Sequence, residues 1–109
     1  MTAELALGLP LLLAVTVGLV WLLAVGAAQV RVVDGAREAA RALARGDAEG
    51  SAFARAAEVA GPGSRVAASY GDGRVSVTVD RRVSGPGGLF DAWPEVGLHA
   101  EAVAAAEAP

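Results

Sequence analysis

The sequence contains no cysteine and no lysine, and its 109 residues include only one histidine and one tyrosine. Without cysteine there is no disulfide framework, no thiolate metal site and no cysteine nucleophile. A single imidazole and a single phenol leave little material for acid–base chemistry near neutral pH. The nine basic residues, all arginine, are outnumbered by twelve acidic ones. The resulting net charge of −3 excludes a strongly basic nucleic-acid-binding protein.

Charged residues are also missing from one long stretch, Leu5 to Val30, which contains no Asp, Glu, Lys or Arg. As an α-helix this stretch would be about 39 Å long, enough to cross the roughly 30 Å hydrocarbon core of a bilayer with some tilt. The alternative is a secretory signal peptide, whose apolar region is shorter, follows basic residues and precedes a small-residue cleavage site. No basic residue precedes this block, and Gly26, Ala27 and Ala28 form only a weak cleavage-like site. We therefore predict a retained transmembrane helix within residues 1–30.

Helix-forming residues continue past the apolar block, so the same helix is expected to extend outside the membrane over residues 31–46. The whole helix would have about 40 residues, more than globular domains normally use. Apolar residues at three- and four-residue spacing predict one narrow buried stripe: Val33, Ala36, Ala40 and Leu43. A second stripe is basic and has acidic residues spaced to pair with it: Arg37, Arg41 and Arg45, with Asp34 and Glu38. Gly46 suits the end of this helix.

Residues 47–109 predict a small domain with one short helix and a sheet. Asp47 suits the N-cap of a helix over about 48–60, whose apolar side would contain Phe53, Ala56 and either Ala57 or Ala60. Alternating residues over 66–70 and 75–80, joined by Gly71-Asp72-Gly73, predict a β-hairpin. A third strand is expected over 96–105, although its alanines are equally compatible with a helix.

These elements predict an α+β fold with a small three-stranded antiparallel sheet. The valine face of the sheet, formed by Val75, Val77 and Val79, must be covered by the outer half of the long helix and by the short helix. We expect Phe90 and Trp93 to close the open end of this core. Trp21 falls in the middle of the predicted span, facing protein or lipid chains.

Polar residues that could form a catalytic or metal site are sparse. His99 and Glu101 would share one face of a strand, a spacing that could suit a metal, but no third ligand is evident. A solvent-facing pair is the preferred interpretation. The sequence predicts no catalytic residue, no metal site and no cofactor.

The N-terminal residues, TAELALGLP at positions 2–10, combine small residues, a single Glu4 and an early Pro10 ahead of a leucine run. This pattern resembles the start of TadE-like proteins, which are minor pilins, or pseudopilins, of tight-adherence type IV pilus systems and related secretion systems. Later segments are similar in composition and order. The resemblance implies a pilin-like fold without enzymatic activity, taking part in assembly of a pilus or related secretion filament. It implies as partners other pilin or pseudopilin subunits, the assembly platform, the secretion ATPase and the prepilin peptidase.

The resemblance also implies roles for two residues. Glu4 would pair with the N-terminal amine of a neighbouring subunit, because both charges need a partner in a low-dielectric helix bundle. The alternative is a boundary charge at the membrane surface, where it costs little. Pro10 removes one helical hydrogen bond and would make the helix flexible as it leaves the bilayer. The family places a basic leader ending in Gly before the mature chain and Glu at its fifth position, so we expect the translation start to lie upstream of Met1.

Two expectations conflict on orientation. Arg31, Arg37, Arg41 and Arg45 all follow the predicted span, and the positive-inside rule would place them, with the C-terminus, in the cytoplasm. The resemblance implies the opposite: a single-pass protein of the cytoplasmic membrane with its C-terminal domain outside, incorporated into an extracellular pilus. We give the resemblance more weight. The alternative function is a single-span membrane protein whose envelope-facing domain binds a partner without joining a filament.

Overall fold

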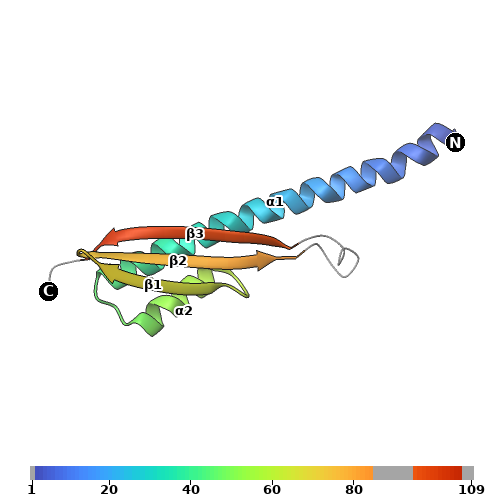
Figure 1. The fold of residues 1–109 in the computed structure, drawn as a ribbon. Coiled ribbons are helices and arrows are strands. Elements are labelled where there is room, and N and C mark those ends of the chain that lie inside the picture. Colours follow the sequence, from blue (N-terminus) through green and yellow to red (C-terminus); the bar gives the residue numbers. More distant parts are fainter. Residues whose placement is uncertain (1, 85–94, 107–109) are drawn as a thin grey trace.

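The structure, a computed structural model, describes residues 2–84 and 95–106. Its elements are α1 (Ala3–Ala44), α2 (Glu49–Ala60), β1 (Arg65–Gly71), β2 (Arg74–Val83) and β3 (Val96–Ala105). The predicted α+β architecture is confirmed: one long helix runs past a small domain made of the second helix and the sheet (Figure 1). The radius of gyration is 19.4 Å, against about 13 Å for a compact chain of this length. The difference arises because the N-terminal half of α1 projects beyond the sheet.

The helix α1 is continuous over 42 residues, which confirms the predicted single helix. At its start, the Thr2 hydroxyl accepts a hydrogen bond from the Leu5 N–H at 3.4 Å. At its end, the N–H groups of Gly46 and Asp47 donate to the carbonyls of Leu43 and Ala42, both at 3.0 Å. This pair of bonds is the Schellman motif, and it needs a left-handed residue where Gly46 has φ +92°. Gly46 therefore ends α1 as predicted.

The second helix begins at Glu49, one residue later than predicted. Ala48 occupies the N-cap position without a side-chain hydrogen bond, so the predicted N-cap at Asp47 was wrong. The Asp47 carboxylate instead lies 2.9 Å from Arg45 and 3.9 Å from Arg55, and these guanidinium groups compete successfully for it.

The predicted ion pairs along α1 were also wrong. Over the described residues, neither Asp34 with Arg37 nor Glu38 with Arg41 approaches within 4.0 Å. Such exposed helix pairs contribute only about 0.2–0.5 kcal/mol, too little to fix two long side chains in one geometry.

The three strands form an antiparallel meander in the order β1-β2-β3. Gly71 faces Arg74 across the hairpin, which leaves Asp72 and Gly73 as a two-residue turn with φ +53° and +71°. Positive φ at both positions is the type I′ geometry that suits the twist of paired strands. The residues 96–105 are a strand and not a helix, with Val79 facing Ala100. The predicted hairpin and third strand are both confirmed.

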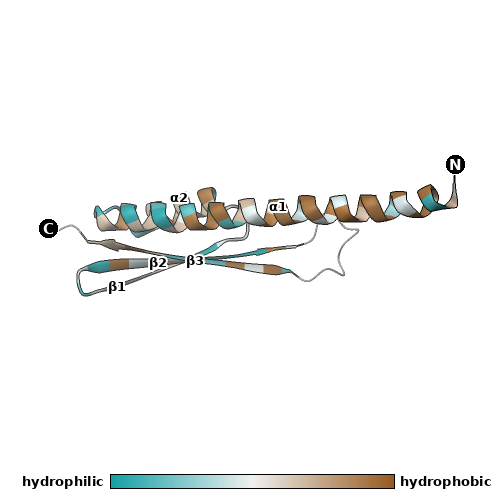
Figure 2. Ribbon diagram, turned by 90° about the horizontal axis from the view of Figure 1, so that it is seen from above, coloured by the Kyte–Doolittle hydropathy of each residue, from teal (hydrophilic) through white to brown (hydrophobic). Residues whose placement is uncertain are grey.

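The core lies between one face of the sheet and the two helices, which occupy the same side of it (Figure 2). The predicted valine face is fully inward: Val75, Val77 and Val79 are at most 1% exposed. The predicted stripe of α1 is buried at Ala36, Ala40 and Leu43 but not at Val33, because the fully buried valine is Val32.

Along α2 the deepest contacts come from alanine. Ala52, Ala56 and Ala60 are fully buried, whereas Phe53 is only half-buried. The expected closing role of Phe90 and Trp93 concerns positions outside the described residues.

Candidate functional site

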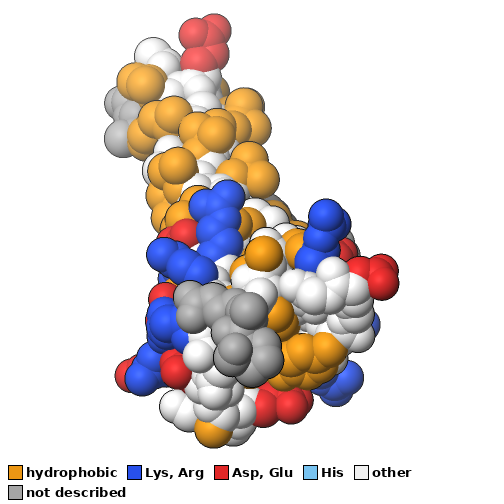
Figure 3. All heavy atoms as spheres, turned by 90° about the vertical axis from the view of Figure 1, so that its left-hand side faces the viewer, with side chains coloured by type: hydrophobic (Ala, Val, Ile, Leu, Met, Phe, Trp, Pro, Cys, Tyr) orange, Lys and Arg blue, Asp and Glu red, His pale blue; other side chains and the backbone are white. Residues whose placement is uncertain are grey.

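The N-terminal half of α1 is an apolar surface that its own chain leaves open. Large exposed side chains follow one another along residues 3–20: Leu5, Leu7, Leu9, Leu11, Leu12, Leu13, Val15, Leu19 and Val20. Figure 3 shows these apolar side chains covering the projecting part of the helix, with acidic atoms at its far end. The helix is long and apolar enough to cross a membrane. Exposed apolar surface of this extent requires lipid or other helices around it, which fits a single-pass anchor.

Glu4 lies in the first turn of this helix and is exposed. Its carboxylate is favourably placed near the positive end of the helix dipole. Within residues 2–84 and 95–106 it has no ion-pair or hydrogen-bond partner. The next charge along the chain is Arg31, so Glu4 is the single charge of the projecting helix. Its pairing with the amine of another subunit stays a prediction.

Pro10 lies inside α1, and the helix continues through it without interruption. Because proline has no N–H, the Ala6 carbonyl loses its usual helical donor at this position. One turn further on, the Thr16 hydroxyl donates to the Leu12 carbonyl at 2.8 Å, which satisfies this polar group within the helix. The flexibility expected at Pro10 stays a prediction.

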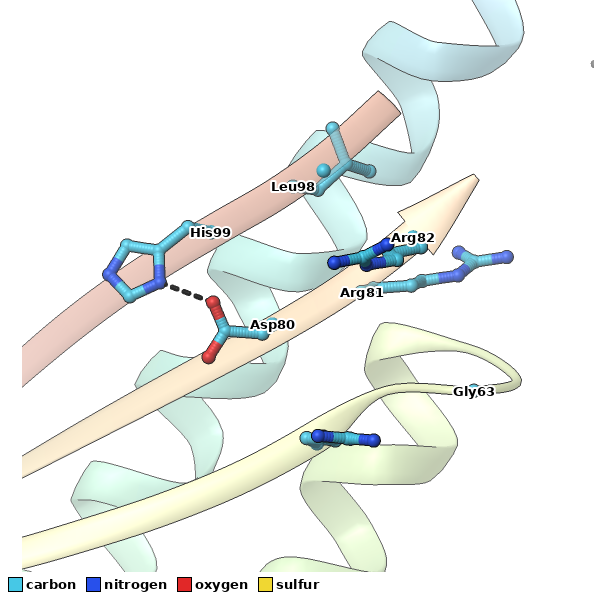
Figure 4. Close-up of a pocket in the computed structure, with 8 residues that line it drawn as sticks. Gly63, Asp80, Arg81, Arg82, Leu98 and His99 are labelled. Atoms are coloured by element: carbon cyan, nitrogen blue, oxygen red, sulfur yellow. Dashed lines mark hydrogen bonds and ion pairs between the residues drawn. The ribbon is translucent and has the colours of Figure 1, made fainter. Parts of the chain in front are cut away.

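A shallow pocket of about 700 Å³ lies on the outer side of the sheet, lined by Gly63, Arg65, Asp80, Arg81, Arg82, Gly97, Leu98 and His99 (Figure 4). In its floor, Arg65, Asp80 and His99 stand opposite one another across the three strands. The His99 Nδ1 atom lies 2.6 Å from Asp80 Oδ1, and both side chains are 59% exposed.

The suggested metal pair of His99 with Glu101 does not form. Glu101 instead accepts a hydrogen bond from the Ser76 hydroxyl at 2.8 Å, and His99 pairs with Asp80. No group of three potential metal ligands occurs in the described part of the chain. His99 and Glu101 are both exposed to solvent, and Asp80 is the partner of His99 that sequence reasoning missed. Asp80 could be identified only from the register that pairs β2 with β3. The alternation of residues within each strand does not specify this register.

Sequence reasoning also missed two arginines that converge on the C-terminus of α2. The Arg31 Nε atom donates to the Val59 carbonyl, and the Arg81 Nη1 atom donates to the Ala60 carbonyl, each at 3.0 Å. Positive charge at a helix C-terminus is favourable, because the last carbonyls lack helical donors. Arg31 is thus bonded within the folded domain directly beyond the apolar run.

Residues 1–41 match the model of the TadE-like protein family, and this segment includes Glu4, Pro10 and the projecting apolar helix. The resemblance drawn from residues 2–10 is thereby confirmed over the N-terminal segment, whereas α2 and the sheet lie outside the match. No curated protein and no solved structure matches the chain significantly.

Proposed function

We propose, from the match of residues 1–41 to the TadE-like protein family, that the protein is a minor pilin, or pseudopilin. It takes part in assembling a tight-adherence type IV pilus or a related secretion filament and has no enzymatic activity. The observation that carries this proposal is the division of α1 into two halves. One half presents exposed leucines and valines, and the other half is covered by a folded domain. Helices of this kind can pack side by side through their apolar halves while the folded domains remain outside.

Glu4 has a specific part in this proposal. When the projecting half of α1 passes from the bilayer into a filament core, the only charge of this half enters an environment without water. A buried carboxylate needs an opposite charge, and in this proposal the amine at the start of a neighbouring subunit provides it. Pro10 supports the same transition, because a helix with one missing hydrogen bond adjusts more easily to a new packing partner.

The proposed location is the cytoplasmic membrane, crossed once, with α2 and the sheet on the outside. The proposed partners are other pilin or pseudopilin subunits, the assembly platform, the secretion ATPase and the prepilin peptidase of the same system. The alternative, an envelope-facing binding domain on a single span, draws support from the sheet pocket around Arg65 and Asp80. The alternative requires no packing of α1 against other subunits, so a test of Glu4 separates the two functions.

Replacing Glu4 by glutamine tests the assembly role, because E4Q keeps the shape and polarity of the side chain and removes only its charge. The matched control is E49Q, since Glu49 is also an exposed glutamate in the first turn of a helix. Breaking a buried ion pair costs about 3–5 kcal/mol, whereas an exposed boundary charge contributes about 0–1 kcal/mol. We therefore expect E4Q to be at least about a hundredfold less abundant in sheared or cross-linked filaments than E49Q.

Carbonate-washed membranes provide the second measurement. Both variants are expected there at the level of the original protein, because neither substitution changes the apolar helix. Normal incorporation of E4Q into filaments would show that Glu4 is a boundary residue. Absence of the original protein itself from filaments, with normal levels in membranes, would favour the alternative function.

A further inference from the structure

The apolar run and the folded domain overlap along α1. The charge-free run extends to Val30, yet the sheet domain already contacts the helix at Trp21, whose Nε1 atom donates to the Ser84 carbonyl at 3.5 Å. Val25 packs against the core, and Ala28 is only 7% exposed. Figure 1 shows β2 and β3 reaching along α1 to about its middle. The ten residues 21–30 of the apolar run, roughly 15 Å of helix, thus lie beside the folded domain.

This overlap conflicts with a membrane boundary at Val30. If hydrocarbon reached Val30, it would also surround the end of the sheet that lies beside Trp21 and Val25. That end carries an ion pair between Arg82 and Glu95 at 3.5 Å, with side chains 82% and 55% exposed. A charged side chain deep in hydrocarbon costs at least about 2.5–3.5 kcal/mol. In addition, the backbone N–H and C=O groups of exposed strand edges would find no hydrogen-bond partners in hydrocarbon.

We infer that the hydrocarbon boundary on the side of the folded domain lies at Trp21, so that residues 3–20 alone cross the bilayer core. This inference rests on the proposed membrane anchoring. Eighteen helical residues span about 27 Å, close to the roughly 30 Å core, without requiring tilt. Glu4 then lies at the opposite boundary, and Trp21 lies at an interface, where tryptophan is enriched.

The remaining apolar side chains fit this boundary. The headgroup layer adds about 5–7 Å to each side of the core, which takes in Leu22 and Leu23, both exposed on the helix. The end of the sheet then lies against the headgroups, where the exposed pair of Arg82 and Glu95 meets water and polar lipid groups. Val30, 58% exposed, lies outside the bilayer.

Cysteine accessibility tests the boundary directly, because the chain contains no cysteine of its own. Three alanines of α1 have exposed side chains and give matched substitutions: A14C, A24C and A27C. Each variant is expressed alone and labelled in open membrane fragments with a membrane-impermeant maleimide, which reaches both faces and makes orientation irrelevant. A boundary at Trp21 places Ala14 in hydrocarbon, Ala24 among headgroups and Ala27 in water. We expect A27C to react at least about tenfold faster than A14C, with A24C between them.

The outcomes separate the boundary from the anchoring. Protection of A27C to the same extent as A14C would place the boundary near Val30 and overturn the inference, with the membrane anchor intact. Rapid labelling of A14C would show that the helix does not cross a membrane, and both this inference and the proposed function would fail. Equal labelling of all three variants after denaturation confirms that each cysteine is reactive and that the difference in intact fragments arises from its environment.

Discussion

At the scale of single residues, Arg31 and Arg81 are fifty positions apart in the sequence and hold the same helix end. Their guanidinium groups donate to the Val59 and Ala60 carbonyls at 3.0 Å. Gly61 makes this convergence possible, since its φ of +106° is unfavourable for other residues and a Cβ there would lie 2.6 Å from Arg81 Nη1. Three elements, α1, α2 and β2, are therefore joined at one point.

Removing Arg81 tests this junction. We expect R81A to lower the free energy of unfolding by about 1–3 kcal/mol, because the Ala60 carbonyl loses a charged donor at a part-buried position. Arg74 lies on the same strand, is exposed and makes no hydrogen bond or ion pair within the described residues, so R74A is the control, expected within about 0.5 kcal/mol of the original protein. Thermal denaturation of the full chain in detergent, followed by circular dichroism, measures both. Equal midpoints for R81A and R74A would show that the junction contributes nothing to stability.

At the scale of elements, the two helices approach closely because the residues between them are small. Gly35 is buried in the C-terminal half of α1, and a Cβ at this position would lie 2.8 Å from the Ala56 carbonyl oxygen and 3.1 Å from the Ala60 Cβ. The same spacing explains why alanine, and not Phe53, supplies the deepest contacts of α2. From the sequence alone, Gly35 reads as a weak point of a helix.

The sign of the change in unfolding free energy caused by G35A tests this packing. A glycine inside a helix normally costs about 0.5–1 kcal/mol relative to alanine, so G35A would be stabilising if only helix propensity mattered. The contact with Ala56 instead predicts that G35A is destabilising by about 1–3 kcal/mol, because the helices must move apart. Gly50 in α2 has open space around it, and G50A is expected to be neutral or stabilising by about 0.5 kcal/mol. Denaturant unfolding of both variants measures the two changes in unfolding free energy. A stabilised G35A would contradict the tight contact between α1 and α2.

The elements themselves follow from local patterns. The charge-free run and the alternating valines of β2 need no tertiary information, and the Asp72-Gly73 turn fixes the register of β1 with β2. Register between β2 and β3 has no such local determinant, because twelve residues separate the two strands. The partner of His99 therefore could not be predicted, and neither could the contact of Trp21 with Ser84. Glu4 and Pro10 were selected by their resemblance to a family motif, which periodicity alone does not provide.

At the scale of the whole molecule, the principal axes measure 74 × 20 × 18 Å, and α1 extends along the longest. The folded domain occupies one half of this length and leaves the other half to lipid or neighbouring helices. The position of the boundary along α1 also affects the conflict over orientation. The positive-inside rule counts basic residues within about 15–20 residues of the end of a span. With the span ending at Trp21, Arg45 lies beyond that distance and Arg41 lies at its limit.

Orientation can be measured on the folded domain itself. Arg31 and Arg37 are then the two basic residues clearly within reach of the rule, in place of four. This weakens the argument for a cytoplasmic domain, and we expect α2 and the sheet to lie outside the cytoplasmic membrane. Ser69 is exposed on β1, so S69C should react with an impermeant maleimide in intact spheroplasts to the same extent as after lysis. Labelling that appears only after lysis would place the domain in the cytoplasm, where it could not join an external filament.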